Sequence, residues 1–299
     1  MTLSIPSGHV SSCEKHDASR SARELKEAIS RRKPVTDEFY NSHYDYVSCV
    51  SKELESLNIN TRSIYGKRLE KHNWLYEEER VQKHNKIINQ YLSGWENIPH
   101  ERKGVITGGL IGSGKTSTMR YHSGIDMNNF ALLSADMMKI HFVEHNLVPP
   151  LEGFLPLEAS ILTYKETNHV TWRLFELAIE RGVNIVFDTM MAEEAATLGK
   201  ISPMLENDYS VDGIFVDVTI ETALRRMKLR HRAGIDNFIV HGRGHGGRLL
   251  PEKSIIEQRS HESNSKNRNV FDKIAGLGFF SNIQIFDNNI DNKKPVRIK

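Results

Sequence analysis

A glycine-rich stretch near the middle of the chain carries the residues best suited to chemistry. Residues 109–116 read GLIGSGKT, which fits the pattern G-x-x-x-x-G-K-S/T. Glycines let successive backbone N–H groups point at phosphate oxygens, while the lysine reaches the β- and γ-phosphates and the hydroxyl ligates Mg²⁺. The sequence therefore predicts a site for ATP or GTP with Mg²⁺, which Thr116 would ligate. The predicted nucleotide-binding residues are Gly109, Gly112, Ser113, Gly114, Lys115, Thr116 and Ser117.

A carboxylate that follows the next apolar run is a candidate general base. The run FALLSA at 130–135 leads into Asp136, and Met137 rather than a glutamate comes next. In a hydrolytic motor a glutamate at that place polarises water, so its absence favours transfer to a substrate hydroxyl whose proton Asp136 accepts. Aspartate is also a preferred N-cap residue of helices, and the two roles are compatible.

A basic stretch later in the chain also favours phosphoryl transfer. Between residues 225 and 248 there are seven lysines and arginines against a single acid, Asp236. Arg226 and Arg230 are one helical turn apart and share a face. The glycine-rich end of the stretch, HGRGHGGR at 241–248, predicts a mobile flap that brings arginines to the transferring phosphoryl group and excludes water. The alternative is a solvated basic helix followed by a loose loop.

The elements that must position these residues alternate between short apolar runs and helical stretches. Continuous apolar runs separated by helices indicate parallel strands that are buried on both faces. We therefore predict an α/β fold with a doubly wound parallel sheet, in which Asp136, Asp188 and the glycine loop, at the carboxyl ends of the strands, face one crevice. The predicted strands lie within 104–110, 130–135, 183–188, 213–218 and 283–287.

The remaining parts of the chain, and its totals, set the domain organisation. Residues 1–21 are rich in serine and predict a disordered tail or an export signal, residues 22–100 predict a helical appendage, and residues 101–299 predict the kinase core. The net charge of +2 gives no support for a nucleic-acid or membrane partner, and no apolar run reaches the roughly 18 residues of a membrane span. Two unclustered cysteines, Cys13 and Cys49, indicate a reducing compartment or no need for disulfides.

Taken together, these motifs resemble the zeta toxins, P-loop kinases of bacterial toxin–antitoxin systems and of some injected effectors. The resemblance spans roughly residues 104–287 and rests on GSGKTS, SADMMK, RGVNIVFDT, the arginine-rich helix and GRLLP before EKSIIEQ. It implies phosphorylation of a sugar hydroxyl with ATP or GTP, typically the 3′-hydroxyl of UDP-N-acetylglucosamine. Some zeta-like effectors are instead similar kinases of NAD that act on a ribose hydroxyl.

The resemblance also implies roles for individual residues. The implied catalytic residues are Asp136 as base, Lys115 of the P-loop, Arg248 of the lid, and Arg230 of the helix, with Arg226 as the alternative one turn earlier. The implied substrate contacts are Lys139 of the Asp-x-x-Lys element, Glu166, Asp188 and Thr189.

Departures from the family pattern concern mainly the substrate. Ile111 stands where proline is common, Asp188-Thr189-Met190 replaces a Glu-Gly-Thr element, and Ala192 stands where an arginine often follows. Because those elements help to hold the nucleotide sugar of the family, UDP-N-acetylglucosamine and NAD both remain candidate acceptors.

Partners and location follow from the resemblance alone. It implies a nucleotide-sugar or dinucleotide substrate, an antitoxin or a secretion chaperone as partner, and a place in the bacterial cytoplasm or, after secretion, in a host cell.

Two other classes of function have weaker signals. A nucleotide-dependent interaction protein would use ATP only to order the flap. The string HFVEH at 141–145 fits the H-x-x-E-H spacing of a zinc protease, but no motif supplies the third ligand, so a polar helix is favoured.

Overall fold

The computed structural model describes Cys13, residues 18–69 and residues 74–299. The chain divides into two units, each built from three stretches of sequence. The helical unit holds the described residues up to Ile87 together with Asp136–Val170 and Lys228–Pro251. The sheet unit holds Ile88–Ala135, Thr171–Met227 and Glu252–Lys299.

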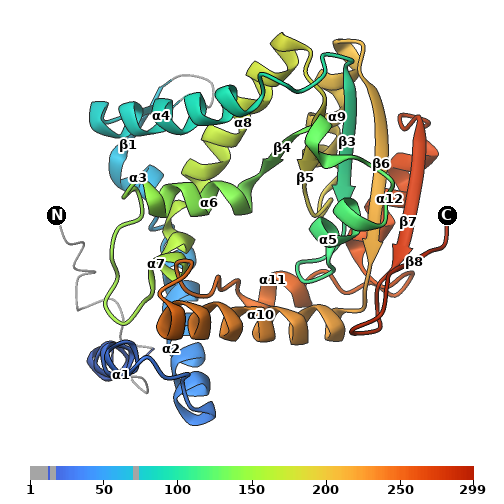
Figure 1. Ribbon diagram of the computed structural model, residues 1–299. Helices are drawn as coiled ribbons and strands as arrows, with labels where there is room; N and C mark the ends of the chain where they lie inside the picture. The colour runs from blue at the N-terminus through green and yellow to red at the C-terminus, as the bar shows by residue number, and fades with distance from the viewer. Residues whose placement is uncertain (1–12, 14–17, 70–73) are drawn as a thin grey trace. The chain divides into compact units, whose positions relative to one another are not determined.

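Six strands form the sheet of the sheet unit, in the order β4-β5-β3-β6-β7-β8 (Figure 1). The first five are parallel, and β8 runs antiparallel to β7 at the edge. The strands are β3 (Lys103–Gly108), β4 (Ala131–Ser134), β5 (Ile185–Asp188), β6 (Ser210–Asp217), β7 (Asn282–Asp287) and β8 (Val296–Arg297). All five predicted strands and the parallel α/β class are confirmed, whereas β8 was not predicted.

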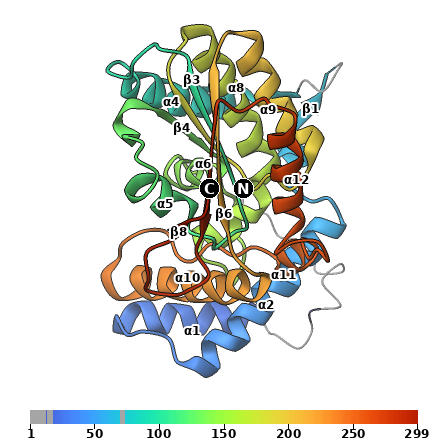
Figure 2. The ribbon, with the colours of Figure 1, turned by 90° about the vertical axis from the view of Figure 1, so that its right-hand side faces the viewer.

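Helices cover both faces of this sheet, because residues that are adjacent along a strand point to opposite sides. Phe215 of β6 packs on Phe271 of α12, with ring centroids 5.1 Å apart, and a Cβ added to Gly104 would lie 2.9 Å from the sulfur of Met204 in α9. Figure 2 shows α5 on one side of the strands and α9 and α12 on the other. The cluster under α5 consists of Val105, Met119, Val186, Ile214 and Phe286.

Among the described residues, four helices and one 3-10 turn belong to the sheet unit alone. It contains α5 (Lys115–Tyr121), η2 (Met127–Asn129), α9 (Glu194–Glu206), α11 (Glu252–Ile256) and α12 (Lys266–Gly276). Four further helices have residues in both units, namely α4 (Glu78–Gly94), α6 (Ala135–Glu144), α8 (Tyr164–Arg181) and α10 (Ile220–His241).

The helical unit is organised around its longest complete helix, α2. Thr36 caps this helix by accepting a hydrogen bond from the backbone N–H of Phe39, and Asp37 and Glu38 add favourable negative charge to its first turn. The elements that belong to this unit alone are α1 (Ala18–Arg31), α2 (Asp37–Ser56), α3 (Thr61–Tyr65), the antiparallel strands β1 (Gly66–Arg68) and β2 (Trp74–Tyr76), α7 (Pro156–Ala159) and η3 (Ser160–Thr163).

A disulfide joins Cys13 to Cys49 of α2, with Cα atoms 5.8 Å apart. The expectation that the cysteines stay unpaired is therefore wrong, since residues far apart in sequence meet only through the fold. Most of the predicted tail over residues 1–21 lies outside the described residues, and α1 begins at Ala18. Among the helices that the structure describes, none combines the length and the apolar character that crossing a membrane requires.

Candidate active site

The loop between β3 and α5 has a backbone that only glycine accommodates at two key positions. Gly109 and Gly112 have φ angles of 127° and 81°, in the region that side chains disfavour. A Cβ on Gly109 would lie 2.3 Å from the carbonyl oxygen of Val216, and one on Gly112 would lie 2.9 Å from that of Ala223. The glycines of the motif are thus required by the packing of the loop on its neighbours.

The polar groups of this loop fit an anionic ligand. The ammonium group of Lys115 donates to the carbonyl oxygens of Gly109, at 2.9 Å, and of Leu110, at 3.2 Å, so it lies back across the loop. The hydroxyl of Ser113 is buried and has no hydrogen-bond partner among the described residues. Thr116 and Ser117 are exposed in the first turn of α5. A buried hydroxyl without a partner beside a glycine cradle is a group that a phosphate would satisfy.

Two further residues support the loop, and the sequence predicted only one of them, as an alternative. The side-chain amide of Asn288, which directly follows β7, donates to the carbonyl oxygen of Ser113 at 2.7 Å. Arg226 of α10 lies against Gly112. A Cβ added to the glycine would be 3.4 Å from the Cβ of the arginine. The Nε of Arg226 donates to Asp291 at 2.8 Å. Arg230, one turn later in α10, is exposed.

Asp188 brings together the carboxyl ends of three strands. Its Oδ1 accepts a hydrogen bond from the hydroxyl of Thr107 in β3 at 3.0 Å, and its Oδ2 accepts one from Ser134 in β4 at 3.3 Å. The backbone N–H of Thr189 donates to the same Thr107 hydroxyl at 3.2 Å. Asp188 therefore lies at the carboxyl end of β3, and β3 leads directly into the glycine loop; that Asp136, Asp188 and this loop face one crevice stays a prediction.

Asp136 forms an ion pair with Arg248, the arginine that the resemblance assigns to the lid. It lies in the first turn of α6, two residues after β4, and its Oδ2 is 2.7 Å from Nη1 of Arg248. The carboxylate keeps 41% of its surface exposed, whereas the arginine keeps 9%. Lys139, one turn further along α6, is buried, and that burial lowers its pKa to about 8 against the opposing effect of Asp136. The partial exposure of this carboxylate leaves it accessible to a ligand, while the ion pair with Arg248 fixes its position.

The glycine-rich stretch after α10, for which the sequence predicts a mobile flap, makes several contacts within the helical unit. The carbonyl oxygen of His245 accepts a hydrogen bond from the backbone N–H of Leu157 at 2.9 Å. Gly246 packs so closely on Leu155 that a Cβ there would lie 2.7 Å from the Cβ of the leucine. With the ion pair of Arg248 at its end, this segment is anchored at three successive points. We refer to residues 242–248 as the arginine loop.

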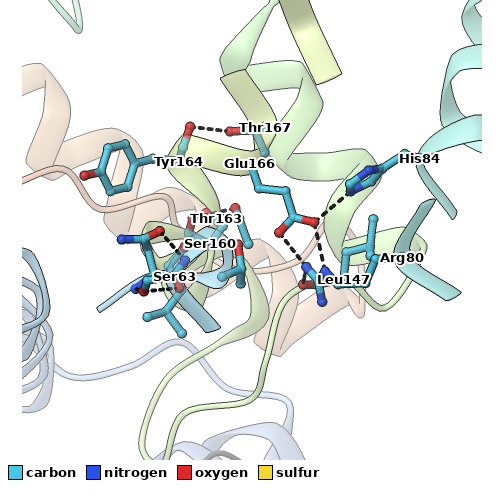
Figure 3. Close-up of polar contacts among 12 residues, drawn as sticks. Ser63, Arg80, His84, Leu147, Ser160, Thr163, Tyr164, Glu166 and Thr167 are labelled. Carbon is cyan, nitrogen blue, oxygen red and sulfur yellow. Dashed lines mark hydrogen bonds and ion pairs between the residues drawn. The ribbon is translucent and has the colours of Figure 1, made fainter. Parts of the chain in front are cut away.

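Glu166 lies in a buried ionic cluster, in which both oxygens of its carboxylate accept hydrogen bonds (Figure 3). Arg80 donates from Nε to Oε1 at 2.8 Å and from Nη2 to Oε2 at 2.6 Å. The Nε2 of His84 lies 2.7 Å from Oε1. The expectation of a solvated acid is therefore wrong, because Glu166 is buried and two side chains of α4 bind it. The sequence offered no signal for these partners, which lie more than eighty positions earlier in the chain.

Replacing Glu166 with glutamine is expected to lower the free energy of unfolding by about 3–5 kcal/mol, because it leaves the buried charge of Arg80 without a counterion. Urea denaturation measures this change. The matched control is Glu176→Gln in the same helix, since the ion pair of Glu176 with Arg173 is exposed and is worth less than about 1 kcal/mol.

Acidification provides a second test of the same cluster. Burial alone would raise the pKa of Glu166, but the hydrogen bonds from His84 and Arg80 outweigh it and lower that pKa. A carboxyl group with a depressed folded-state pKa stabilises the fold above its unfolded-state pKa, and this stabilisation is lost as pH falls through the folded-state pKa. The glutamine variant should lack this acid-dependent loss. Equal acid sensitivity in both proteins would contradict the assignment.

The strand, glycine loop and helix of the sheet unit define a P-loop fold of the kinase type. The family model of the zeta toxins matches residues 94–293. The chain therefore belongs to the zeta toxin family, a family of toxic kinases, and it is a nucleotide-binding phosphotransferase.

Solved structures of low sequence identity share this fold. The structure of the PezAT toxin–antitoxin system of Streptococcus pneumoniae has 13% identity and a TM-score of 0.53, covering 74% of this chain and 81% of its own. The AvrRxo1-ORF1:-ORF2 structure with ATP has 15% identity and a TM-score of 0.54, covering 80% and 75%. A second structure of that pair, with sulphate ions, has a TM-score of 0.56 at 15% identity, covering 80% and 76%. No curated protein sequence matches this chain.

Proposed function

We propose that this protein is an ATP-dependent kinase that acts as a toxin by phosphorylating a sugar hydroxyl of a nucleotide-type substrate, the 3′-hydroxyl of UDP-N-acetylglucosamine. The observation that carries the proposal is the ion pair between Asp136 and Arg248. Asp136 comes two residues after β4, in a chain that belongs to the zeta toxin family. The partial exposure of that carboxylate supports a role in accepting the proton of an acceptor alcohol.

The nucleotide would be held by the loop of the sheet unit. The backbone N–H groups of residues 109–117 and the ammonium group of Lys115 suit the β- and γ-phosphates, for which ATP is the proposed donor and GTP the alternative. Thr116 has the exposed hydroxyl that would ligate Mg²⁺, which reduces the negative charge on the phosphates when bound. Among the described residues no group of three His, Cys, Asp or Glu side chains is placed to hold a separate metal ion.

In the proposed reaction Asp136 accepts the proton of the acceptor hydroxyl as that oxygen attacks the γ-phosphorus. The bond from the γ-phosphorus to its bridging oxygen breaks, ADP leaves, and the protonated carboxyl group returns its proton to solvent. Lys115, Arg248 and one arginine of α10, Arg230 or Arg226, spread the charge that develops on the phosphoryl oxygens, which is where most of the catalysis of phosphoryl transfer lies.

The helix arginine has two candidates. Arg230 is exposed, whereas Arg226 lies beside Gly112 of the nucleotide loop and is paired with Asp291. The contact with the loop favours Arg226 as the arginine nearest to the phosphates. Lys139, Asp188 and Thr189 remain the proposed substrate contacts, and Glu166 is left out because Arg80 and His84 occupy it.

Mass spectrometry of small molecules incubated with the protein and Mg·ATP identifies the acceptor. We expect UDP-N-acetylglucosamine to gain the mass of one phosphoryl group, and Asp136→Ala to form no such product. A product from NAD alone would move the reaction to a ribose hydroxyl, which the replacement of Glu-Gly-Thr by residues 188–190 makes a specific alternative. If nucleotide sugars, NAD and nucleosides all stay unchanged, the protein is a nucleotide-dependent interaction protein and the proposed function is wrong.

A neutralising partner is part of the proposal. The PezAT structure belongs to a toxin–antitoxin system, and the AvrRxo1 structures hold two proteins, ORF1 and ORF2. These likenesses support an antitoxin or a secretion chaperone as partner, with the toxin kept inactive in the bacterial cytoplasm or delivered to a host cell as an effector.

A further inference from the structure

A buried carboxylate with two histidines joins three helices of the helical unit. The Oε1 of Glu158 in α7 lies 2.8 Å from Nε2 of His43 in α2 and 3.0 Å from Nε2 of His231 in α10. Its Oε2 accepts the backbone N–H of Leu155 at 2.7 Å. All three side chains are completely buried. Burial raises the pKa of Glu158, but the two histidines outweigh it and lower that pKa to about 2, so the carboxylate stays charged.

The same helix, α2, also contacts a basic part of α10, the residues from Lys228 to Arg232. The hydroxyl of Tyr40 donates to the carbonyl oxygen of Lys228 at 2.9 Å, and the carboxylate of Asp37 pairs with Arg232. The ammonium group of Lys228 lies 5.0 Å from the ring centroid of Tyr44. Lys228 and Arg232, which the sequence grouped with the phosphate-binding arginines, therefore bind the N-terminal region.

The arginine loop packs directly on His231 and on Leu155, the two residues that bind Glu158 from this side. A Cβ on Gly247 would lie 2.2 Å from the carbonyl oxygen of His231 and 2.7 Å from its ring carbon Cδ2. On the other side, Gly246 touches Leu155, the residue whose N–H binds Glu158. The next residue after these two glycines is Arg248, which pairs with Asp136 at 2.7 Å. An uninterrupted series of contacts thus runs from α2 to the proposed catalytic base.

We propose that His43, Glu158 and His231 are positioning residues, which fix the arginine loop and so hold Arg248 against Asp136. This role rests on the proposed function, since the position of Arg248 matters to the rate only if Asp136 and Arg248 serve phosphoryl transfer. Through His43, the helix α2 then contributes to the position of Arg248 in the kinase. Because the loop of residues 109–117 does not take part in these contacts, its affinity for ATP should not depend on them.

Two substitutions of His43 test the first contact. His43→Leu removes the group that binds Glu158 and should lower kcat about 10²-fold, the usual penalty for misplacing a catalytic group by about 1 Å, with the KM for ATP unchanged. His43→Gln places an amide N–H near the position of Nε2 and should restore most of kcat. Wild-type kcat in the leucine variant would overturn the proposal, as would equal kcat losses in the leucine and glutamine variants.

Gly247→Ala tests the last contact without touching any charge. The added methyl group must displace the arginine loop from His231, so kcat should again fall about 10²-fold while ATP binding stays normal. The control is Gly276→Ala at the end of α12, where an added methyl group meets nothing within 4 Å. If His43→Leu fails to fold, Gly247→Ala decides the outcome.

A double-mutant cycle with Arg248→Ala separates positioning from general damage. If the cluster acts through Arg248, Gly247→Ala should change the kcat of the Arg248→Ala protein by less than about twofold, because the group that it misplaces is already gone. Losses that multiply would contradict the proposal.

Hydrogen exchange of the backbone amides in residues 242–250 gives a readout that needs no activity. His43→Leu and Gly247→Ala should accelerate this exchange relative to the wild-type protein, and Gly276→Ala should not. Unchanged exchange in both variants would overturn the proposed positioning even in an active kinase. Accelerated exchange in a protein that phosphorylates no acceptor would show that the cluster holds the loop and that the proposed function is what failed.

Discussion

Asp136→Ala is expected to abolish phosphoryl transfer and to leave the affinity for ATP unchanged. A positioned general base contributes about 10²–10⁴-fold to a rate, and the carboxylate is also the partner of Arg248. Removing it therefore deprives the acceptor hydroxyl of its proton acceptor and frees the arginine at the same time. ATP affinity should survive because the phosphate-binding groups lie in residues 109–117. Product formation and ATP binding, measured separately, check both halves of this expectation.

Asp136→Asn distinguishes a base from a structural partner. The amide keeps the shape of the carboxylate and can still accept a hydrogen bond from Arg248, but it cannot take a proton at neutral pH. We expect this variant to be as inactive as the alanine variant, with Asp45→Asn on the exposed surface of α2 as the control. Transfer at the wild-type rate by Asp136→Asn would remove Asp136 from the role of base.

Lys115→Ala should have the second large effect and should act on binding as well as on transfer. The ammonium group lies within the glycine loop, where it now donates to Gly109 and Leu110, and a bound phosphate would replace those acceptors. Loss of one preorganised donor to a developing charge costs about 10²–10³-fold in rate. Loss of a charge-assisted hydrogen bond to the phosphates weakens binding about tenfold or more. Cells that express this variant should also escape toxicity.

Calorimetric titration with ATP and a growth assay check the prediction for Lys115. Lys103→Ala is the matched control, because Lys103 lies in the strand that leads to the same loop but has an exposed side chain paired with Glu101. Undiminished ATP affinity in Lys115→Ala would mean that the nucleotide does not use the loop in the manner described.

The parts of the fold that the sequence predicted are those that local pattern determines. Strands β3 to β7 are buried on both faces, so each reads as a continuous apolar run. The nucleotide loop needs glycine at fixed spacing because its backbone takes left-handed angles and touches Val216 and Ala223, and such a requirement is visible in one sequence. Strand β8 was missed because its two residues are exposed and carry no apolar pattern.

The parts that were not predictable depend on partners that are distant in sequence. His43 and His231 lie 115 and 73 positions from Glu158, and nothing in the local sequence of any of them signals the others. The same is true of Glu166, which on sequence alone is an acid on a helix, and of the Cys13–Cys49 disulfide.

The basic stretch shows most clearly what a sequence leaves undetermined. Its lysines and arginines cannot be told apart by charge, yet in the structure they contact three different sets of partners. Arg225 and Arg226 pair with Asp291, Lys228 and Arg232 hold α2, and Arg248 binds Asp136. Charge composition predicted a phosphate-binding stretch, whereas only the packing shows that Arg248 pairs with Asp136 and that the neighbouring Gly247 lies against His231.

Following the γ-phosphoryl group of ATP tests the central claim most directly. Purified protein would be incubated with Mg²⁺, γ-labelled ATP and a metabolite extract, and the labelled products separated from inorganic phosphate. Transfer to an alcohol predicts that the label moves to an organic acceptor and that Asp136→Asn forms none of this product. Label that appears only as inorganic phosphate, at the same rate in the wild-type and Asp136→Asn proteins, would contradict the account.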